Sequence, residues 1–160
     1  MAFQTKITEI LDVHQIPYCL LPHDEPVFTV EAAAQQRGVV AEEMVKSILL
    51  RDKVGHYVMA CVLGQTRLDP KAVRAYVASD WKRLYFANSE EVRAVTGCPQ
   101  GAVAPLGLPE DVPVIFDKAV VLQNKVNISS GDPMAGLELD AQDLIRVAGA
   151  RLAPIARDSE

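Results

Sequence analysis

Two apolar runs separated by a short polar segment constrain the fold of this chain more than any other feature. Residues 47–50 and 57–63 are largely apolar, and the segment between them, 51–56, carries three charged side chains, a histidine and a glycine. Apolar runs that flank a short polar loop predict a β-hairpin with antiparallel strands. We therefore expect this hairpin to form the centre of a β-sheet.

Helix and strand signals lie on both sides of the predicted hairpin. Helices interleaved with short strands predict a mixed α/β fold, a mostly antiparallel sheet flanked by helices, in a single domain spanning residues 1–160. The expected helices are one built on Phe3, Ile7, Ile10 and Leu11 before Pro17, one from Val30 to about Arg37 after an N-cap at Thr29, a turn at Ala41 to Met44, one from Asp69 through Val73, Tyr76 and Val77, one from Asn88 to Gly97, and one from Asp140 to Gly149. The further expected strands are Tyr18 to Leu21, Val114 to Phe116, Val126 to Ser129, Leu137 to Leu139 and an edge strand within Leu152 to Ile155.

Charge and cysteine content limit the partners and the compartment. Lys and Arg number 16 against 21 Asp and Glu, which gives a formal net charge of −5. Tight nucleic-acid binding through many phosphates needs a basic face, so we expect any RNA contact to be a local patch of modest affinity. The three cysteines are widely separated, and no apolar run is long enough to span a membrane. These features predict a cytoplasmic protein that binds no DNA, metal or membrane.

The sequence contains none of the common catalytic motifs. A GxSxG elbow, an HExxH pair, a P-loop and a GxGxxG after a strand are all absent. We expect structural roles for His14 and His56, whereas His23, in a loop between two prolines, is a candidate site residue. Cys61 is interpreted as a core residue, and Cys98 as an unreactive loop cysteine because no basic partner is adjacent in the sequence.

Two other features favour a binding site. Lys46 stands at the head of the first hairpin strand, on the same face as Ile48 and Leu50. Its aliphatic chain either extends along the apolar surface and places the ammonium in solvent, or the ammonium enters a cavity and meets a phosphate or carboxylate. Segment 97–109 is rich in glycine and proline. Such residues let a ligand approach closely and leave amides free to bind an anion or oxyanion, whereas loop length alone favours a long surface connection.

Three segments together resemble one protein family. They are Val45 to Leu50 with its strand lysine, the loop from Thr96 to Gly107 with a GxxxP pattern at Gly101 to Pro105, and Ser129 to Gly131 ahead of the GLEL stretch Gly136 to Leu139. In this order they resemble the YbaK and prolyl-tRNA-synthetase-associated editing-domain family over almost the whole chain. The resemblance implies a free-standing aminoacyl-tRNA deacylase, which hydrolyses the ester of a wrongly charged tRNA.

The resemblance also implies a mechanism and a set of site residues. An aminoacyl ester is already activated, so an oriented water or ribose hydroxyl can cleave it once the developing oxyanion is stabilised. Lys46 is expected to anchor the terminal phosphate or ribose, and Gly101 to begin the loop whose amides meet the carbonyl; no cofactor is implied. The other expected substrate-binding residues are His23, Ser47, Ala102, Val103, Ala104, Pro105, Ser129, Ser130 and Gly131.

Two serines bear on the identity of the amino acid. In relatives that act on alanyl-tRNA, Asn follows the lysine and a His takes the place of Ser129. The pair Lys46-Ser47 in this sequence looks closer to the branch of the family that clears Cys-tRNA(Pro). Serine, threonine and alanine esters stay open as substrates.

The expected partner is the acceptor end of mischarged tRNA, with prolyl-tRNA synthetase as a further candidate. Five basic residues either contact the acceptor end of the tRNA or simply form a solvated surface: Arg67, Lys71, Arg74, Lys82 and Arg83. Two other functions stay open: a module that binds an aminoacyl-nucleotide without turnover, and an interaction protein that docks onto a synthetase.

Overall fold

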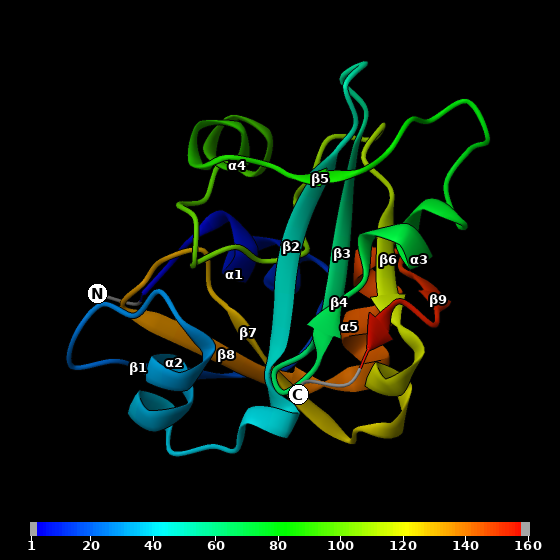
Figure 1. Cartoon of the computed structure of the whole chain (residues 1–160). Helices are drawn as coiled ribbons and strands as arrows, with labels where there is room; N and C mark the ends of the chain where they lie inside the picture. Colours follow the sequence, from blue (N-terminus) through cyan, green and yellow to red (C-terminus); the bar gives the residue numbers. More distant parts are fainter. Residues whose placement is uncertain (1–2, 158–160) are drawn as a thin grey trace.

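The predicted hairpin lies at the centre of a five-stranded sheet in the computed structural model, which describes residues 3–157 (Figure 1). The strands follow the order β5-β2-β3-β6-β9, and β2 and β3 form the hairpin. β2 pairs antiparallel with both β3 and β5, whereas β6 pairs parallel with both β3 and β9. The strands are β2 Val45–Arg51, β3 Tyr57–Leu63, β5 Tyr85–Phe86, β6 Val114–Asp117 and β9 Arg151–Ala153.

A second, three-stranded sheet packs against one face of the first. Its order is β1-β8-β7, and both pairings are antiparallel. Val126 and Ile128 of β7 share a buried cluster with Leu49 of β2, so the main core lies between the two sheets. Strands β4 and β10 pair antiparallel with each other and belong to neither of these sheets. These strands are β1 Tyr18–Pro22, β7 Lys125–Ser129, β8 Ala135–Asp140, β4 Arg67–Leu68 and β10 Ala156–Arg157.

The helices begin at side-chain caps that the sequence indicated. Thr29, Asn88 and Asp140 each accept a hydrogen bond from a backbone amide of the first helical turn. Glycines in the left-handed conformation follow the same three helices, as the stop signals predicted. The helices are α1 Lys6–Val13, α2 Val30–Arg37, α3 Pro70–Arg74, α4 Ser89–Thr96 and α5 Ala141–Ala148, with 3₁₀ turns η1 Ala41–Glu43 and η2 Lys118–Leu122.

The mixed α/β fold is confirmed, and antiparallel pairings outnumber parallel ones within residues 3–157. One helix is shorter than predicted: α3 ends at Arg74 instead of continuing through Val77. After Arg74 the amides of Ala75 and Tyr76 bond to carbonyls three residues back, which closes tighter turns, and the Arg74 guanidinium donates to the carbonyl of Trp81. The first helix begins only at Lys6 because Thr5 caps it, and β9 ends at Ala153.

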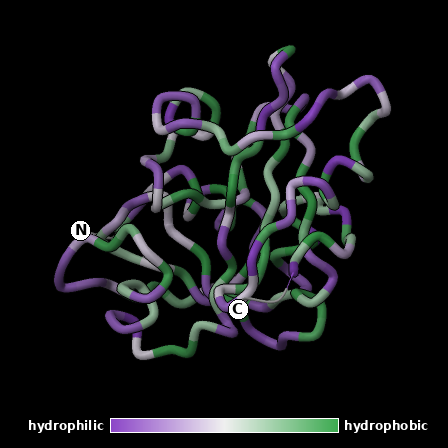
Figure 2. Tube along the Cα trace, viewed as in Figure 1, coloured by the Kyte–Doolittle hydropathy of each residue, from purple (hydrophilic) through white to green (hydrophobic). Residues whose placement is uncertain are grey.

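The five-stranded sheet separates two buried clusters. Leu49 belongs to the cluster between the sheets, and its neighbour Leu50 belongs to a second cluster with Trp81 on the opposite face. This division follows from strand geometry, because successive side chains point to opposite faces. The central strands are accordingly hydrophobic and the hairpin turn hydrophilic (Figure 2). No helix among the described residues is long and apolar enough to cross a membrane.

The hairpin turn is held by a buried carboxylate, Asp52. It accepts hydrogen bonds from the amides of Val54, Gly55 and His56, from the Lys82 amide at 2.9 Å and from the His56 ring at 2.7 Å. Burial opposes ionisation, but the His56 ring and these amides outweigh it and hold the pKa of Asp52 well below its ordinary value. His56 therefore orders this turn, and its ring stacks on Trp81 with centroids 4.7 Å apart.

We expect Asp52→Ala to lower the free energy of unfolding by about 2 kcal/mol or more, because four backbone amides and the His56 ring lose their common acceptor. Since the folded-state pKa is depressed, the stability that ionised Asp52 contributes is present above its unfolded value and lost as the pH falls below about 4. Urea unfolding between pH 3 and pH 7 measures both effects. Asp111→Ala, at an exposed turn, is the control. Equal stability of the two variants at pH 7 would contradict this account.

Candidate active site

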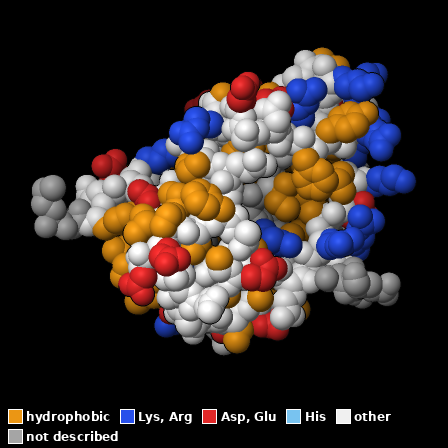
Figure 3. Space-filling model, turned by 60° about the vertical axis from the view of Figure 1, so that its left-hand side comes forward, with side chains coloured by type: hydrophobic (Ala, Val, Ile, Leu, Met, Phe, Trp, Pro, Cys, Tyr) orange, Lys and Arg blue, Asp and Glu red, His pale blue; other side chains and the backbone are white. Residues whose placement is uncertain are grey.

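A pocket of about 430 Å³ opens beside the free edge of β2. The segments that line it are the chain from residue 23 through α2, β2 with the residue before it, Gly64 after β3, the end of β5 and the start of α4, the start of the 97–109 loop, and residues 129–133. The hollow is visible in Figure 3, with hydrophobic side chains on both sides and Lys and Arg side chains gathered along one side. It brings together His23, Lys46, Ser47, Gly101, Val103 and Ser129 of the predicted site residues.

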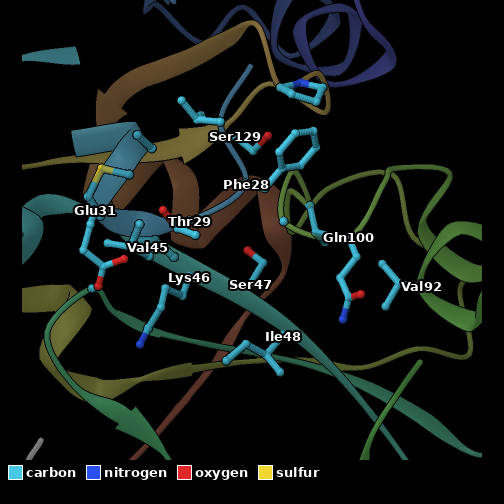
Figure 4. Close-up of a pocket in the computed structure, with 18 of the residues that line it drawn as sticks. Phe28, Thr29, Glu31, Val45, Lys46, Ser47, Ile48, Val92, Gln100 and Ser129 are labelled. Atoms are coloured by element: carbon cyan, nitrogen blue, oxygen red, sulfur yellow. The ribbon is translucent and has the colours of Figure 1, made fainter. Parts of the chain in front are cut away.

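Lys46 lies at the rim of this pocket on the face of β2 that the sequence predicted. Its ammonium donates to the Thr66 carbonyl at 2.6 Å and points toward the side of Glu31 (Figure 4). Partial burial lowers the pKa of Lys46, the charge of Glu31 opposes that shift, and the charge of Arg67 adds to it. A half-buried ammonium with one protein acceptor retains two donors for a ligand.

Ser47 points the opposite way from Lys46, into the pocket between Phe28, Ser129 and Gln100 (Figure 4). Its hydroxyl oxygen lies 3.4 Å from the Cys61 sulfur, which donates to it. Cys61 itself is fully buried, and burial raises the pKa of its thiol to about 12. This thiol is therefore a packing group beneath the serine, as its place in an apolar run predicted.

The 97–109 loop is packed into the molecule and is not a mere surface connection. Gly101 has φ +89°, and a Cβ there would stand 2.7 Å from the Phe28 carbonyl oxygen, so the loop touches the chain that leads into α2. Gln100, Gly101 and Val103 line the pocket. The other predicted loop residues lie outside the lining and are buried: Ala102, Ala104 and Pro105. Cys98 is also buried.

The segment after β7 contributes one serine to the pocket and uses the next two residues for a turn. Ser129 lines the pocket, and its hydroxyl accepts from the Gly131 amide at 3.1 Å. Ser130 is fully buried, with its hydroxyl donating to the Ala135 carbonyl at 2.7 Å. Gly131 has φ +91°. Ser130 and Gly131 are thus outside the pocket lining and hold Ser129 in place.

His23 forms a fixed pair with Arg37. The His23 Nδ1 lies 2.8 Å from the Pro133 carbonyl, to which it must donate, so Nε2 is free to accept from the Arg37 Nε at 3.0 Å. Burial lowers the pKa of His23, which agrees with a neutral ring. The Arg37 guanidinium packs against Gly136 of β8, where an added Cβ would stand 2.0 Å from it. His23 therefore positions Arg37 and has no free lone pair with which to accept a proton.

Sequence reasoning missed several residues of the pocket. Arg37 gave no signal beyond the end of a helix, because its partners His23 and Gly136 come from distant segments. The exposed rings of Phe28 and Phe86 could have been noticed only with the fold known. Residues that line the pocket without having been predicted include Phe28, Glu31, Arg37, Phe86, Gln100 and Asp132. Among residues 3–157, no group of His, Cys, Asp or Glu side chains is arranged to hold a metal ion.

A sequence profile described as the aminoacyl-tRNA editing domain matches residues 24–147, which include every residue of the pocket except His23. The chain belongs to the aminoacyl-tRNA editing domain family. It is accordingly an editing hydrolase of the aminoacyl-tRNA deacylase class.

Individual relatives of this editing domain are named for proline. The chain is 31% identical over 146 residues to the prolyl-tRNA editing protein ProX of Acetoanaerobium sticklandii, covering 88% of this chain and 87% of that one. It is 34% identical over 94 residues to the proline–tRNA ligase of Kosmotoga olearia, covering 59% of this chain but only 16% of the ligase.

Solved structures share the fold over nearly the full length of the editing domain. A crystal structure of a hypothetical protein has a TM-score of 0.86 at 27% identity, with 96% of this chain and all of that chain covered. A candidate trans-editing enzyme for prolyl-tRNA synthetase has a TM-score of 0.80 at 25% identity, with 98% of this chain and 99% of the other covered.

Proposed function

We propose that this editing domain acts in trans on tRNA(Pro) charged with a wrong small amino acid, and that Cys-tRNA(Pro) is its preferred substrate. The observation that carries the proposal is the convergence of Lys46, Ser47 and Gly101 on one pocket of about 430 Å³. These residues belong to the segments that resemble the family. A pocket of this size is typical of small-molecule sites and suits an aminoacyl ester on a terminal nucleoside.

The proposed mechanism uses orientation and charge and needs no protein nucleophile. The Lys46 ammonium anchors the terminal phosphate or ribose, and the Gly101 amide donates to the ester carbonyl, where negative charge develops. A water molecule oriented by the neighbouring ribose hydroxyl then attacks that carbonyl, the ester C–O bond breaks, and the ribose oxygen leaves with a proton from the attacking water, which releases the free amino acid. His23 is an unsuitable general base because Arg37 occupies its Nε2 lone pair.

The preference for a small amino acid rests on the polar floor of the pocket. Ser47 and Ser129 present hydroxyl groups there, and Val103 and Phe28 narrow the space beside them. Hydroxyl groups favour a short side chain with a polar tip, such as the thiol of cysteine. One methylene changes discrimination by only about 1 to 3 kcal/mol, so serine, threonine and alanine esters compete as slower substrates.

Recognition of the tRNA is proposed to be confined to its acceptor end. The net charge of −5 disfavours contact along a whole tRNA. Basic side chains nevertheless gather beside the hollow (Figure 3). The predicted basic residues are all exposed: Arg67, Lys71, Arg74, Lys82 and Arg83. A protein that clears tRNA released by prolyl-tRNA synthetase would work in the cytoplasm, with that synthetase as a neighbour.

A panel of charged tRNAs tests the proposal. The purified protein is incubated with tRNA(Pro) carrying cysteine, alanine, serine, threonine or proline, and the remaining ester is measured against buffer alone. We expect the cysteine ester to disappear fastest and the proline ester to persist. Loss of no ester above the buffer rate would overturn the deacylase proposal and favour a module that binds without turnover. Faster loss of another ester would overturn only the preference for cysteine.

A further inference from the structure

One stretch of the β2 backbone faces the pocket without a neighbouring strand. Strand β5 pairs with only two residues of β2, Leu50 and Arg51. The Ala87 amide extends this pairing by one bond at 3.0 Å to the Leu49 carbonyl, and then Asn88 caps α4 and the chain turns away. The next place along the edge, opposite Ser47, therefore has no β5 residue.

The register shows which groups of Ser47 point to this edge. In an antiparallel pair, the backbone groups of alternate residues point to the same side. The Met44 carbonyl bonds to Gly64 and the Asp52 amide to His56, so the even-numbered residues of β2 bond to β3. The amide and carbonyl of Ser47 thus point to the opposite edge, where the Leu49 carbonyl already bonds to Ala87. Ser47 lines the pocket and is only partly buried.

An amino-acid ester carries the two groups that such an edge needs. Two residues that pair across antiparallel strands exchange an N–H and a C=O in each direction. An aminoacyl group has an α-ammonium donor and a carbonyl acceptor in the same relative positions as one strand residue. The place opposite Ser47 lies between the Ala87 bond to Leu49 and the isolated parallel bridge that joins Met44 to Asn127 of β7, and an extended ligand can pair with such a stretch of strand edge.

We propose that the Ser47 backbone holds the aminoacyl group as one additional strand residue. The Ser47 carbonyl accepts from the α-ammonium, and the Ser47 amide donates to the ester carbonyl. That carbonyl oxygen has two lone pairs, so it can accept from Ser47 and from the Gly101 amide together. The inference rests on the proposed function, because it takes the ligand to be an aminoacyl ester.

This pairing also fixes the direction of the substrate. An antiparallel ligand runs from the Leu49 end of the edge toward the Val45 end, so its ester oxygen and ribose leave on the Lys46 side of Ser47, near the start of β2. Its side chain projects from the same face as Ser47, into the pocket beside Ser129 (Figure 4). One backbone contact thereby directs the ribose toward the ammonium and the side chain toward the hydroxyl groups.

Binding of uncleavable analogues tests the pairing. The first probe is adenosine carrying alanine through a 3′-amide, and the second carries propionate and so lacks only the α-amine. Calorimetry measures Kd for the wild type, Ser47→Ala, which keeps the amide, and Ser47→Pro, which removes it without breaking a bond to β3. We expect the wild type and Ser47→Ala to bind the alanyl probe about 10-fold more tightly than the propionyl probe. Ser47→Pro should bind the alanyl probe about 10-fold more weakly than Ser47→Ala does.

Two results would overturn the pairing. One is equal affinity of the wild type for the two probes, or no binding of either. The other is equal affinity of folded Ser47→Pro and Ser47→Ala for the alanyl probe. If Ser47→Pro does not fold, as its melting curve would show, the comparison of the two probes on the wild type decides. Neither probe is hydrolysed, so this result is separate from the tRNA panel that tests the deacylase activity.

Discussion

Replacing Lys46 by alanine is expected to reduce kcat/KM for the mischarged tRNA by about 100-fold, with most of the loss in KM. The ammonium is partly buried at the pocket rim, and its single protein acceptor is the Thr66 carbonyl. A charge-assisted hydrogen bond to phosphate or ribose contributes about 1.5 to 3 kcal/mol, which corresponds to roughly 10- to 100-fold. The upper value applies because the ammonium is partly buried, where water screens its interaction with a phosphate less than at an exposed site.

The matched control for Lys46 is Lys53→Ala, which removes an exposed lysine from the turn of the same hairpin. Lys53 lies outside the pocket, so this variant should deacylate at the wild-type rate. Thermal unfolding of both variants separates lost contacts to substrate from lost folding. A folded Lys46→Ala protein with kcat/KM within threefold of wild type would remove Lys46 from the mechanism.

Replacing Gly101 by alanine is expected to lower kcat/KM by about 100-fold for a steric reason. The added Cβ would stand 2.7 Å from the Phe28 carbonyl oxygen and 3.0 Å from its Cα, and backbone atoms cannot move aside as a flexible side chain can. The loop must therefore shift away from Phe28 and carry its amide out of place. Removing one oxyanion donor costs on the order of 100-fold in rate.

Gly55→Ala separates this displacement from simple backbone strain. Gly55 has φ +108°, similar to the +89° of Gly101, but a Cβ there would meet nothing within 4 Å. Both variants should lose about 1 kcal/mol of stability or more, because a side chain is strained at positive φ. Only Gly101→Ala should also lose activity. Equal activities of the two folded variants, measured with the same charged tRNA, would show that the Gly101 amide plays no part.

Local patterns predicted most elements of the fold, because their signals lie within a few residues. The caps at Thr29, Asn88 and Asp140 and the alternation around Lys46 needed no tertiary information. The end of α3 could not be predicted, because the apolar spacing continues through Val77 whereas the backbone after Arg74 closes tighter turns. The parallel pairing of β6 with β3 and β9 also depends on contacts distant in the sequence.

The candidate site was only partly predictable for a similar reason. Residues 46, 47, 101 and 129 were recognised from ordered motifs, and the structure places them around one pocket. Ala102 and Ala104 belong to the same motif, yet their side chains pack inward. Arg37, in contrast, was not predicted but does line the pocket. His23 and Gly136 hold its side chain there, and nothing in the sequence of α2 indicates those two partners.

The position of Trp81 gives this protein an internal optical reporter. It is the only tryptophan, it is buried in the second cluster on the opposite face of the five-stranded sheet from the main core, and its ring stacks on His56. It does not line the pocket, so ligand binding should leave its fluorescence unchanged while unfolding of the second cluster exposes it. The emission spectrum can therefore follow folding in the same cuvette in which an aminoacyl ester is being hydrolysed.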